Sequence, residues 1–335
     1  MIRKIIKTIL LLSVITVFVV GISFYISATK WSSKTLSEVE VARGMSVRGI
    51  ATLLEKKGII GAPKLFEIFV RIKGIENDLK SGTYDFPVGT TMMSAIESLR
   101  KGDVRQYTFT IIEGWTVRDI ANALKAKPFI TDENMPEEFE RFAFDKEFTR
   151  SLGFDSPSLE GYLYPDTYKV NYPLRAKEFL KRLTDMFKKV YGDVTANANL
   201  PLSENEVVTL ASIVEKETGV ASERPLIAGV FFNRIKRGIA LQSDPTIIYG
   251  LPNYDGNIRK RDISNPHPYN TYVHAGLPPG PICNPGKASI EAVIHPEISE
   301  YIYFVSKNDG SHYFSRTLTE HLNAVRKYQI YRNRK

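Results

Sequence analysis

The pattern of apolar and polar positions begins with one long apolar run. Residues 9–28 carry no charged side chain and are predominantly apolar. This length matches the roughly 20 residues that a helix needs to cross a bilayer core. By the positive-inside rule, basic residues mark the cytoplasmic side, and here three of them precede the run: Arg3, Lys4 and Lys7. We therefore expect a cytoplasmic tail over 1–8 and a transmembrane helix over 9–28, with the rest of the chain outside.

A cleaved signal peptide is the alternative interpretation of this run. The run is longer than the apolar part of a usual signal peptide, and Ser27 and Ala28 form only a weak cleavage site. An uncleaved anchor is therefore the favoured interpretation. No second run of this kind follows in the sequence, which predicts a single-pass protein.

After a polar linker over 29–36, shorter periodic segments predict a small α/β unit over 37–104. The pattern indicates a strand over 39–41, a helix starting near Ser46, a helix near 63–73, a strand over 82–86 and a helix near 91–100. The order strand, helix, helix, strand resembles a LysM-like carbohydrate-binding module. This resemblance rests on the order of the elements and not on a sharp motif.

One short pattern occurs twice. A glycine, one further residue and then Ser or Thr precede an apolar helix at Gly44 and again at Gly114. In both copies a strand leads into the glycine, the second strand covering 107–112. We expect matching strand–turn–helix geometry, with Ser46 and Thr116 as helix N-caps. Such a junction is also generic, so the repeat by itself indicates no function.

The segment 105–170 contains this second βα repeat and a connector. Residues 130–150 are polar, acidic and aromatic, and we expect them to be helical. Residues 159–168 combine aromatic side chains with Gly and Pro, which is typical of an ordered loop. Such a loop could bind sugar or pack in the core, and the sequence favours neither. A long amphipathic helix near 176–191 then opens a last domain over 171–335.

The most informative helix starts at Ser203 and ends at Glu217. Ser203 and Glu206 form an S-x-x-E capping box. The apolar positions that follow have the spacing of one buried face: Val207, Leu210, Ala211 and Val214. Glu217 falls at the rim of that face, where partial desolvation should raise its pKa. A raised pKa suits a general acid near neutral pH, although Glu and Lys at a helix end are more often solvated. Glu215 is the alternative acid.

A second helix over 226–237 should follow, with Ser222 as its N-cap and Gly238 at its end. The two helices would form a hairpin with the glutamates at its turn. Residues 241–250 and 265–282 are rich in Pro, Gly, Asn and Tyr and lack periodicity. Long loops of this kind are uncommon unless they build a site. Their amides and tyrosines would suit a groove for a neutral polysaccharide.

Composition and charge exclude few classes of function. The 335 residues carry a net charge of +8 with a pI near 9.2, and Lys and Arg are scattered. A basic surface suits a polyanionic polymer or an anionic membrane, and it equally suits ordinary solubility. The sequence has no nucleic-acid-binding motif, and we expect no nucleic-acid partner. The single cysteine, Cys283, excludes an intrachain disulfide and is expected to be a passive small residue.

Several enzyme classes are excluded by missing motifs. There is no HExxH, no P-loop and no GxSxG elbow, and the five histidines lack metal-ligand spacing. We therefore expect neither a metal nor a cofactor. A two-carboxylate glycosidase would need a second acid facing the first. Asp244 and Asp166 are the candidates, but neither has an evident partner role.

Four stretches together resemble the YceG-like family of endolytic murein transglycosylases. They cover residues 211–218 (ASIVEKET), 241–246 (LQSDPT), 269–272 (YNTY) and 276–282 (GLPPGPI). The resemblance extends over essentially the whole chain, including the anchor and the LysM-like unit. In that family the second Glu of the E-K-E-T run is catalytic, which corresponds to Glu217.

The resemblance implies an α+β fold: one transmembrane helix, a LysM-like module, and a catalytic domain whose helical hairpin carries the acid. It implies cleavage of the MurNAc-β-1,4-GlcNAc bond within peptidoglycan glycan strands, leaving 1,6-anhydro ends. The enzyme would sit in the bacterial plasma membrane with its catalytic domain outside, near peptidoglycan synthases. The residues assigned to the groove are Gln242, Asp244, Tyr249, Asn270 and Tyr272.

Two rival functions stay open on the sequence. A hydrolytic muramidase would use the same substrate, with Asp244 serving a water molecule. A non-enzymatic scaffold would bind the wall through the LysM-like unit alone.

Overall fold

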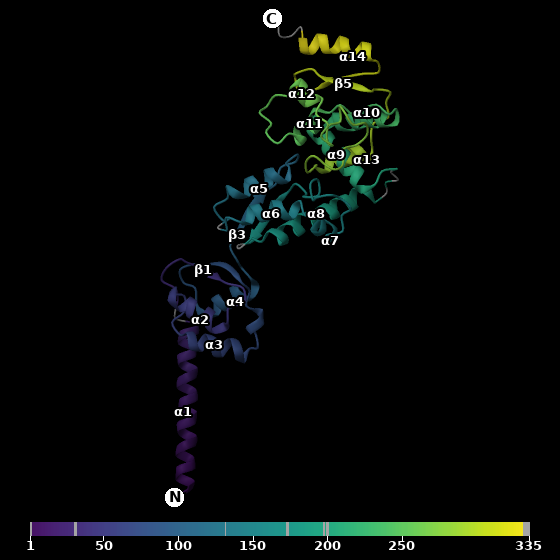
Figure 1. Ribbon diagram of the computed structural model, residues 1–335. Helices are drawn as coiled ribbons and strands as arrows, with labels where there is room; N and C mark the ends of the chain where they lie inside the picture. Colours follow the sequence, from purple (N-terminus) through teal and green to yellow (C-terminus); the bar gives the residue numbers. More distant parts are fainter. Residues whose placement is uncertain are drawn as a thin grey trace. The chain divides into compact units, whose positions relative to one another are not determined.

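The computed structural model describes residues 2–29, 32–130, 132–171, 174–196, 198 and 201–330. The chain divides into two compact units (Figure 1). Unit 1 comprises residues 1–108 and 169–173, and unit 2 comprises residues 109–168 and 174–335. The elements are helices and three two-stranded sheets, which confirms the mixed α+β class.

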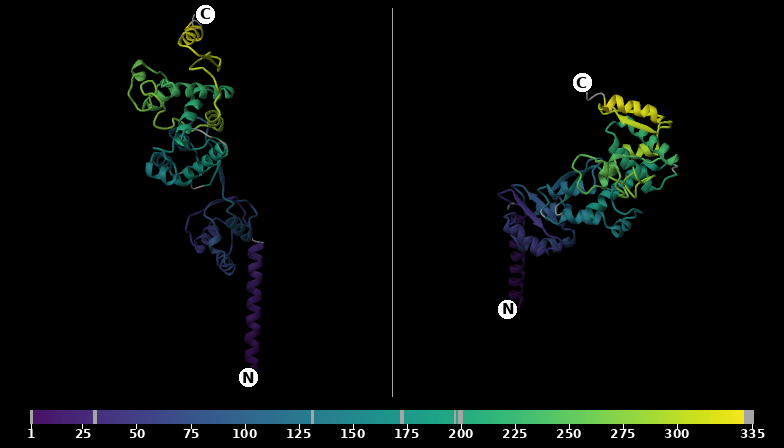
Figure 2. Two further views of the ribbon diagram at one scale, coloured as in Figure 1. Left: turned by 90° about the vertical axis from the view of Figure 1, so that its right-hand side faces the viewer. Right: turned by 45° about the horizontal axis from the view of Figure 1, so that its top comes forward.

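Unit 1 begins with α1 (Ile2–Thr29), which is one continuous helix (Figure 2). Many of its apolar side chains are exposed, among them Leu10 and Phe18. Across the part of the chain that the structure describes, no helix combines the length and hydropathy needed to cross a bilayer. Within the predicted linker 29–36, residues 30 and 31 lie outside the described residues.

The rest of unit 1 follows the predicted order of elements. β1 (Ser37–Val41), α2 (Val47–Lys56), α3 (Pro63–Ile72), the 3₁₀ turn η1 (Glu76–Asp78), β2 (Gly82–Phe86) and α4 (Met92–Lys101) succeed one another. β1 and β2 are antiparallel, with Ser37 opposite Phe86 and Val41 opposite Gly82. The predicted order of strand, helix, helix and strand is therefore confirmed.

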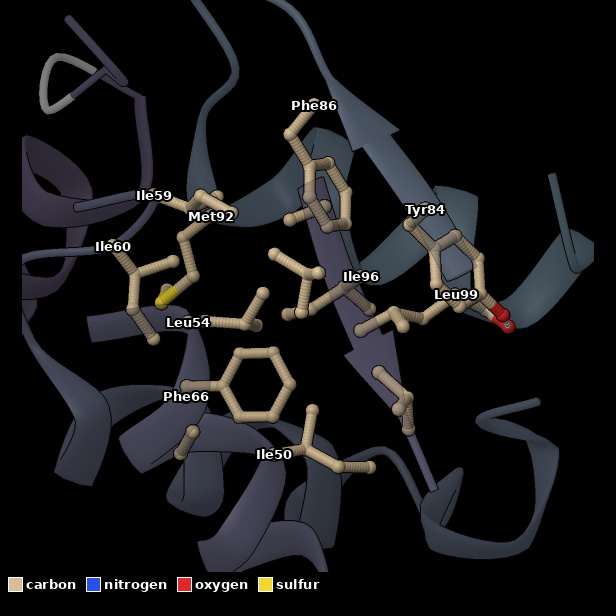
Figure 3. Packing of buried hydrophobic residues seen from close by; sticks show 14 of the residues in the cluster. Ile50, Leu54, Ile59, Ile60, Phe66, Tyr84, Phe86, Met92, Ile96 and Leu99 are labelled. Carbon is tan, nitrogen blue, oxygen red and sulfur yellow. Dashed lines mark hydrogen bonds between the residues drawn. The ribbon is translucent and has the colours of Figure 1, made fainter. Parts of the chain in front are cut away.

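The core of unit 1 lies between this two-stranded sheet and the helices α2, α3 and α4. Phe66 and Leu54 face Tyr84 and Phe86 across it (Figure 3). Burying each such side chain contributes about 1.5–3 kcal/mol. The Tyr84 hydroxyl reaches the edge of the core and donates to the carbonyl of Lys80 at 2.7 Å.

Unit 2 is mainly helical. Its first part holds α5 (Val117–Lys125), α6 (Met135–Ala143), α7 (Lys146–Ser151) and α8 (Ala176–Thr195). β3 (Gln106–Thr110) pairs with β4 (Thr167–Asn171), and each of these two strands has residues in both units. Its second part holds α9 (Glu204–Glu217), η2 (Ala221–Glu223), α10 (Arg224–Lys236), α11 (Asp244–Gly250), α12 (Lys260–Ile263) and α13 (Lys287–Ile294). The antiparallel hairpin β5 (Tyr303–Ser306) and β6 (His312–Ser315), then α14 (Leu318–Val325) and η3 (Arg326–Ile330), end the described chain.

The catalytic candidate lies on α9, which packs against α13, α10 and α11. The aromatic segment 159–168 is a packed core loop, because Leu159, Tyr162 and Leu163 are buried. This outcome favours the core interpretation of that segment.

The repeated junction has the predicted geometry in both units. Gly44 and Gly114 both adopt a left-handed φ of +78°, a conformation that side-chain-bearing residues rarely adopt. Ser46 caps α2 by accepting from the N–H of Gly49, and Thr116 caps α5 in a capping box. The repeat is therefore a real structural duplication.

Two local predictions were wrong. Ser222 is not a helix N-cap: it lies in η2, and α10 begins directly after this turn at Arg224. Pro225 explains the start, because a proline has no N–H to leave unpaired in the first turn of a helix. Residues 241–250 are not all loop, since α11 occupies Asp244–Gly250 and has its own proline, Pro245, in its first turn.

Candidate active site

α9 places Glu217 at the junction between a buried helix and an extended chain. Ser203 and Glu206 form the predicted capping box at its start. Val207, Leu210, Ala211 and Val214 are at most 1% exposed, as their spacing predicted. The prediction of a single buried face was wrong, because the helix is surrounded here and the residues between these positions are buried as well: Val208, Thr209, Ser212 and Ile213. Glu217 is the last helical residue, and Thr218 is extended with a φ of −144°. The end of the helix therefore places the Glu217 carboxylate at the edge of the core, where the residue is half-buried.

The Glu217 carboxyl is held next to Ser243. The Ser243 hydroxyl donates a hydrogen bond of 2.5 Å to Glu217 Oε1. Burial raises the pKa of Glu217 to about 7, opposed by the Ser243 hydrogen bond and Arg234 and assisted by the charge of Asp244. A carboxyl with this pKa is protonated in a large fraction of molecules at neutral pH. It can act as a general acid, and its ionised form can act as a base.

Arg234 on α10 fixes the start of the loop that presents Ser243. Its guanidinium donates to the carbonyl oxygens of Leu241 at 2.6 Å, Ala240 at 3.3 Å and Ile302 at 2.6 Å. Burial lowers the pKa of Arg234, while nearby acidic groups including Glu217 raise it. The residue therefore braces the loop and adds positive charge beside the acid.

Thr271 fixes the same loop from the other side. Its carbonyl accepts from the N–H of Gln242 at 3.1 Å, and its hydroxyl accepts from the N–H of Ser243 at 3.0 Å. Gln242 has a φ of +50°, an uncommon conformation for a residue other than glycine. Its side chain is exposed. The strained backbone turns Ser243 inward and leaves the Gln242 amide available outside.

Asp244 and Tyr272 form a second polar pair near Glu217. The Tyr272 hydroxyl donates to Asp244 Oδ1 at 2.7 Å. Burial and then Asp244 raise the pKa of Tyr272, with a further contribution from Glu217. Asp244 is exposed, so its remaining oxygen is open to solvent or substrate. Of the five predicted groove residues, Asp244 and Tyr272 thus lie close enough to the acid to interact with its charge, and Gln242 directly precedes Ser243 in the chain.

Asn270 lies behind this cluster. It is 1% exposed, and its amide nitrogen donates to the carbonyl oxygens of Asp262, Ile263 and Asn265. Its side-chain oxygen accepts from the N–H of Tyr272 at 2.9 Å. The side chain is committed to the protein backbone, so it shapes the loop that carries Tyr272.

Tyr249, at the far end of α11, contacts a buried carboxyl. Its hydroxyl donates to Glu160 Oε2 at 3.3 Å. Glu160 is 1% exposed and also accepts from the N–H of Val117 at 3.0 Å and from the Asn284 amide at 3.4 Å. Burial raises the pKa of Glu160 to about 8, although the hydrogen bonds from Val117 and Tyr249 oppose the rise. Glu160 therefore connects α11 to the start of α5.

Glu215, the alternative acid, is used in a different way. It forms an ion pair of 3.4 Å with Arg224, both side chains being nearly buried. Its other oxygen accepts from the N–H of Gly286 at 2.9 Å. The carboxylate is paired with a cation and a backbone donor, which suits a structural role in joining α9 to α10 and α13.

The other candidate groups lie outside this cluster. Asp166 sits at the start of β4, where its side chain accepts from the N–H of Thr167 at 2.6 Å. Cys283 is fully buried and donates to the carbonyl of Ser212, and burial raises its thiol pKa. Among the described residues, no three His, Cys, Asp or Glu side chains gather as a metal site would require.

Comparison with known proteins places these residues in a family. The profile of the YceG-like family matches residues 39–327. The chain belongs to the YceG-like family. An endolytic murein transglycosylase of Bacillus subtilis is 32% identical over 320 residues, covering 90% of this chain and 88% of that protein. One of Streptococcus pneumoniae strain D39 is 30% identical over 88% of this chain, which spans 60% of that longer protein.

A solved structure agrees with the family assignment. A YceG-like protein of Listeria monocytogenes is 31% identical, with a TM-score of 0.58. The match covers 87% of this chain and all of that one. The similarity therefore extends through both units of this YceG-like chain and is not limited to the region of Glu217.

Sequence reasoning missed four residues of the YceG-like site: Ser243, Arg234, Thr271 and Glu160. Ser243 lies in the 241–246 stretch, so it was close to detection. Thr271 likewise lies in the 269–272 stretch. The contacts of Arg234 and Thr271 are to backbone carbonyl and N–H groups, which leave no spacing pattern. The left-handed conformation at position 242 is likewise not evident from the sequence, because the residue there is Gln and not Gly.

Proposed function

We propose that this protein is an endolytic peptidoglycan lytic transglycosylase that uses Glu217 as its single acid and base. The observation that carries the proposal is the Glu217 carboxyl, whose pKa of about 7 lets it exist in both forms at neutral pH. Membership of the YceG-like family supports the same conclusion, as do relatives named endolytic murein transglycosylase. The substrate would be the MurNAc-β-1,4-GlcNAc bond within a glycan strand.

The proposed reaction needs two proton transfers through one carboxyl. Glu217 gives its proton to the glycosidic oxygen while the bond from that oxygen to C1 of the muramic residue breaks. The ionised carboxylate then takes the proton of the muramic C6 hydroxyl, whose oxygen bonds to C1. The products are a 1,6-anhydro end and a free GlcNAc 4-hydroxyl, and no water is consumed.

The groove residues divide into two groups in this proposal. Gln242, Asp244 and Tyr272 would contact the glycan, because Asp244 and Tyr272 interact with the charge of the acid, and Gln242 and Asp244 are exposed. The Asp244 carboxylate would stabilise positive charge that develops at C1. Tyr249 and Asn270 would act from behind by holding α11 and the Tyr272 loop.

A hydrolytic muramidase is the second candidate, and the exposed Asp244 is the observation that favours it. An ionised carboxylate close to the acid could activate a water molecule. The two reactions differ in their products, since hydrolysis leaves a reducing end heavier by one water. Mass spectrometry of the released glycans therefore separates them.

Digestion of purified sacculi tests the proposal. The full chain in detergent should release fragments with 1,6-anhydro ends, and internal cuts should yield short glycans early in the digestion. Reducing ends in place of anhydro ends would establish the muramidase. If wild type and Glu217→Gln both bind sacculi and neither releases fragments, the result would indicate a wall-binding scaffold.

We further propose that α1 anchors the protein in the plasma membrane and that unit 1 binds glycan. The exposed apolar side chains of α1 and the basic residues that precede them support the anchor. The strand–helix–helix–strand order of unit 1 supports a LysM-like role. An anchored enzyme of this kind would act close to peptidoglycan synthases and shorten newly made strands.

A further inference from the structure

We infer that Ser243 is a positioning residue: its hydroxyl holds the Glu217 carboxylate in the state that must accept the second proton of the reaction. The inference rests on the proposed function for its catalytic meaning. The hydrogen bond itself is a feature of the fold, and it can be tested without substrate.

The geometry of Ser243 leaves its side chain little freedom. The residue is 2% exposed. Its N–H donates to the hydroxyl of Thr271 at 3.0 Å, and its carbonyl accepts from the hydroxyl of Thr246 at 2.6 Å. With both backbone groups engaged, the hydroxyl lies 2.5 Å from Glu217 Oε1. Such a short O–H to carboxylate contact is typical of a charge-assisted hydrogen bond.

The loop that carries Ser243 is built to keep this contact. Gln242 adopts a φ of +50°, and strained backbone of this kind costs about 1–3 kcal/mol. Such strain persists only where surrounding contacts fix it, and here Arg234 binds the carbonyls before Gln242 while Thr271 binds the N–H groups of Gln242 and Ser243. The contact to Glu217 is therefore imposed on the loop and is not a chance rotamer.

The charges that face Glu217 from the packed elements oppose one another. Arg234 on α10 favours the carboxylate, and Asp244 on α11 favours the protonated acid. Tyr272, in the loop that follows α12, acts indirectly, because its hydroxyl donates a hydrogen bond to Asp244. Burial favours the protonated form most strongly. Ser243 is the uncharged donor in contact with the carboxyl that offsets burial.

This balance matters because one carboxyl performs both steps. A Glu217 that stayed protonated could give the first proton but could not take the second from the C6 hydroxyl. Loss of a hydrogen bond to a charged group is worth about 1.5–3 kcal/mol. That corresponds to a loss of roughly 10- to 100-fold in kcat, with little change in KM because Ser243 is buried.

The test compares Ser243→Ala with Ser212→Ala in the full chain. Ser212 is also a fully buried serine, but its hydroxyl contacts Thr209 and Ile282 on α9 and the loop before α13. The first readout is the titration of Glu217 in protein with ¹³C-labelled glutamate carboxyls, the signal being assigned by its loss in Glu217→Gln. Ser243→Ala should move this titration upward by about one pH unit or more, and Ser212→Ala should not.

A second pair of variants separates the hydroxyl from packing. Ser243→Thr and Ser243→Val differ mainly by one hydroxyl, so only the threonine should keep the Glu217 titration close to wild type. The pH profile of kcat on sacculi should move in the same direction as the titration. An unchanged titration in Ser243→Ala, or equal shifts in the threonine and valine variants, overturns the inference. If the Glu217 titrations of all variants behave as expected but no anhydro products form, the proposed function is refuted and the role of the Ser243 hydroxyl is not.

Discussion

Glu217 and Glu215 lie two residues apart on α9, but the structure gives them different tasks. Glu217→Gln should lower the release of anhydromuramyl products by at least 10²–10⁴-fold, because glutamine cannot donate a proton to the leaving oxygen. Binding to sacculi should remain, since the side chains are nearly the same size. Both product release and binding to sacculi are measured on the same preparation of the variant.

Glu215→Gln is the matched control, and it should affect stability more than chemistry. The change weakens the bond to the Gly286 N–H and leaves the Arg224 cation nearly buried without its partner. We expect a loss of about 1–3 kcal/mol in unfolding free energy, with detectable activity at low temperature. The opposite ranking of the two variants in activity would assign the acid to Glu215.

The pH dependence of the reaction should follow Glu217. Because burial raises its pKa to about 7, the acid form needed for the first step is lost as the pH rises above this value. We expect kcat/KM on sacculi to fall about tenfold per pH unit well above pH 7. A profile that is flat from pH 6 to 9 would show that this carboxyl does not limit the reaction.

At the scale of the element, the two ends of α9 should respond to pH in opposite ways. The pKa of Glu217 is raised from its ordinary value of 4.5 to about 7. Its contribution to stability is therefore fully present below pH 4.5 and lost as the pH rises to about 7. Hydrogen bonds from Ser203 lower the pKa of Glu206. That contribution is present above pH 4.5 and is lost as the pH falls.

Thermal unfolding between pH 3 and 8 measures this difference. Relative to wild type, Glu217→Gln should become more stable as the pH rises, and Glu206→Gln should become less stable. Both variants keep a similar shape and sit on the same helix, so packing effects largely cancel. Parallel trends in the two variants would contradict the environments described for the two ends.

At the scale of the whole molecule, α1 and the remainder of the chain should be separable in function. A chain beginning at Ser32 keeps the β1–β2 sheet and all of unit 2. We expect this chain to digest sacculi at a rate within about twofold of full length, since the acid and its contacts are untouched. Full-length protein should float with vesicles containing phosphatidylglycerol, while the shortened chain should not.

Vesicle flotation of the full chain decides the anchor prediction. Recovery of full-length protein in the vesicle-free fractions would contradict it. Recovery of both chains with vesicles would instead indicate a membrane contact outside α1.

Local patterns in the sequence were enough to predict most elements. The capping box of α9 and the Gly44 and Gly114 junctions depend on residues within one helical turn, so local capping chemistry defines them. Periodicity indicated only one buried face of α9, whereas packing on all sides buries residues 207–214. The start of α10 was misplaced because a 3₁₀ turn and Pro225 outweighed Ser222 as a cap. The choice of Glu217 also came from the chain, through its place at the rim of an apolar face and the family motif.

Only the tertiary structure decided how that glutamate is held. Three residues hold Glu217 or the loop beside it, and they lie 17 to 54 positions from Glu217 in the sequence: Ser243, Arg234 and Thr271. Ser243 contacts Glu217 directly, while the other two bind backbone groups of the loop that carries Ser243. The left-handed turn at Gln242 is imposed by those contacts and not by its residue type. Glu160 likewise accepts hydrogen bonds from Val117, Tyr249 and Asn284, which are distant from it in the sequence. Sequence by itself determined the capped start of α9 and indicated Glu217 as the candidate acid, while long-range hydrogen bonding determined the surroundings that set the proton affinity of this carboxyl.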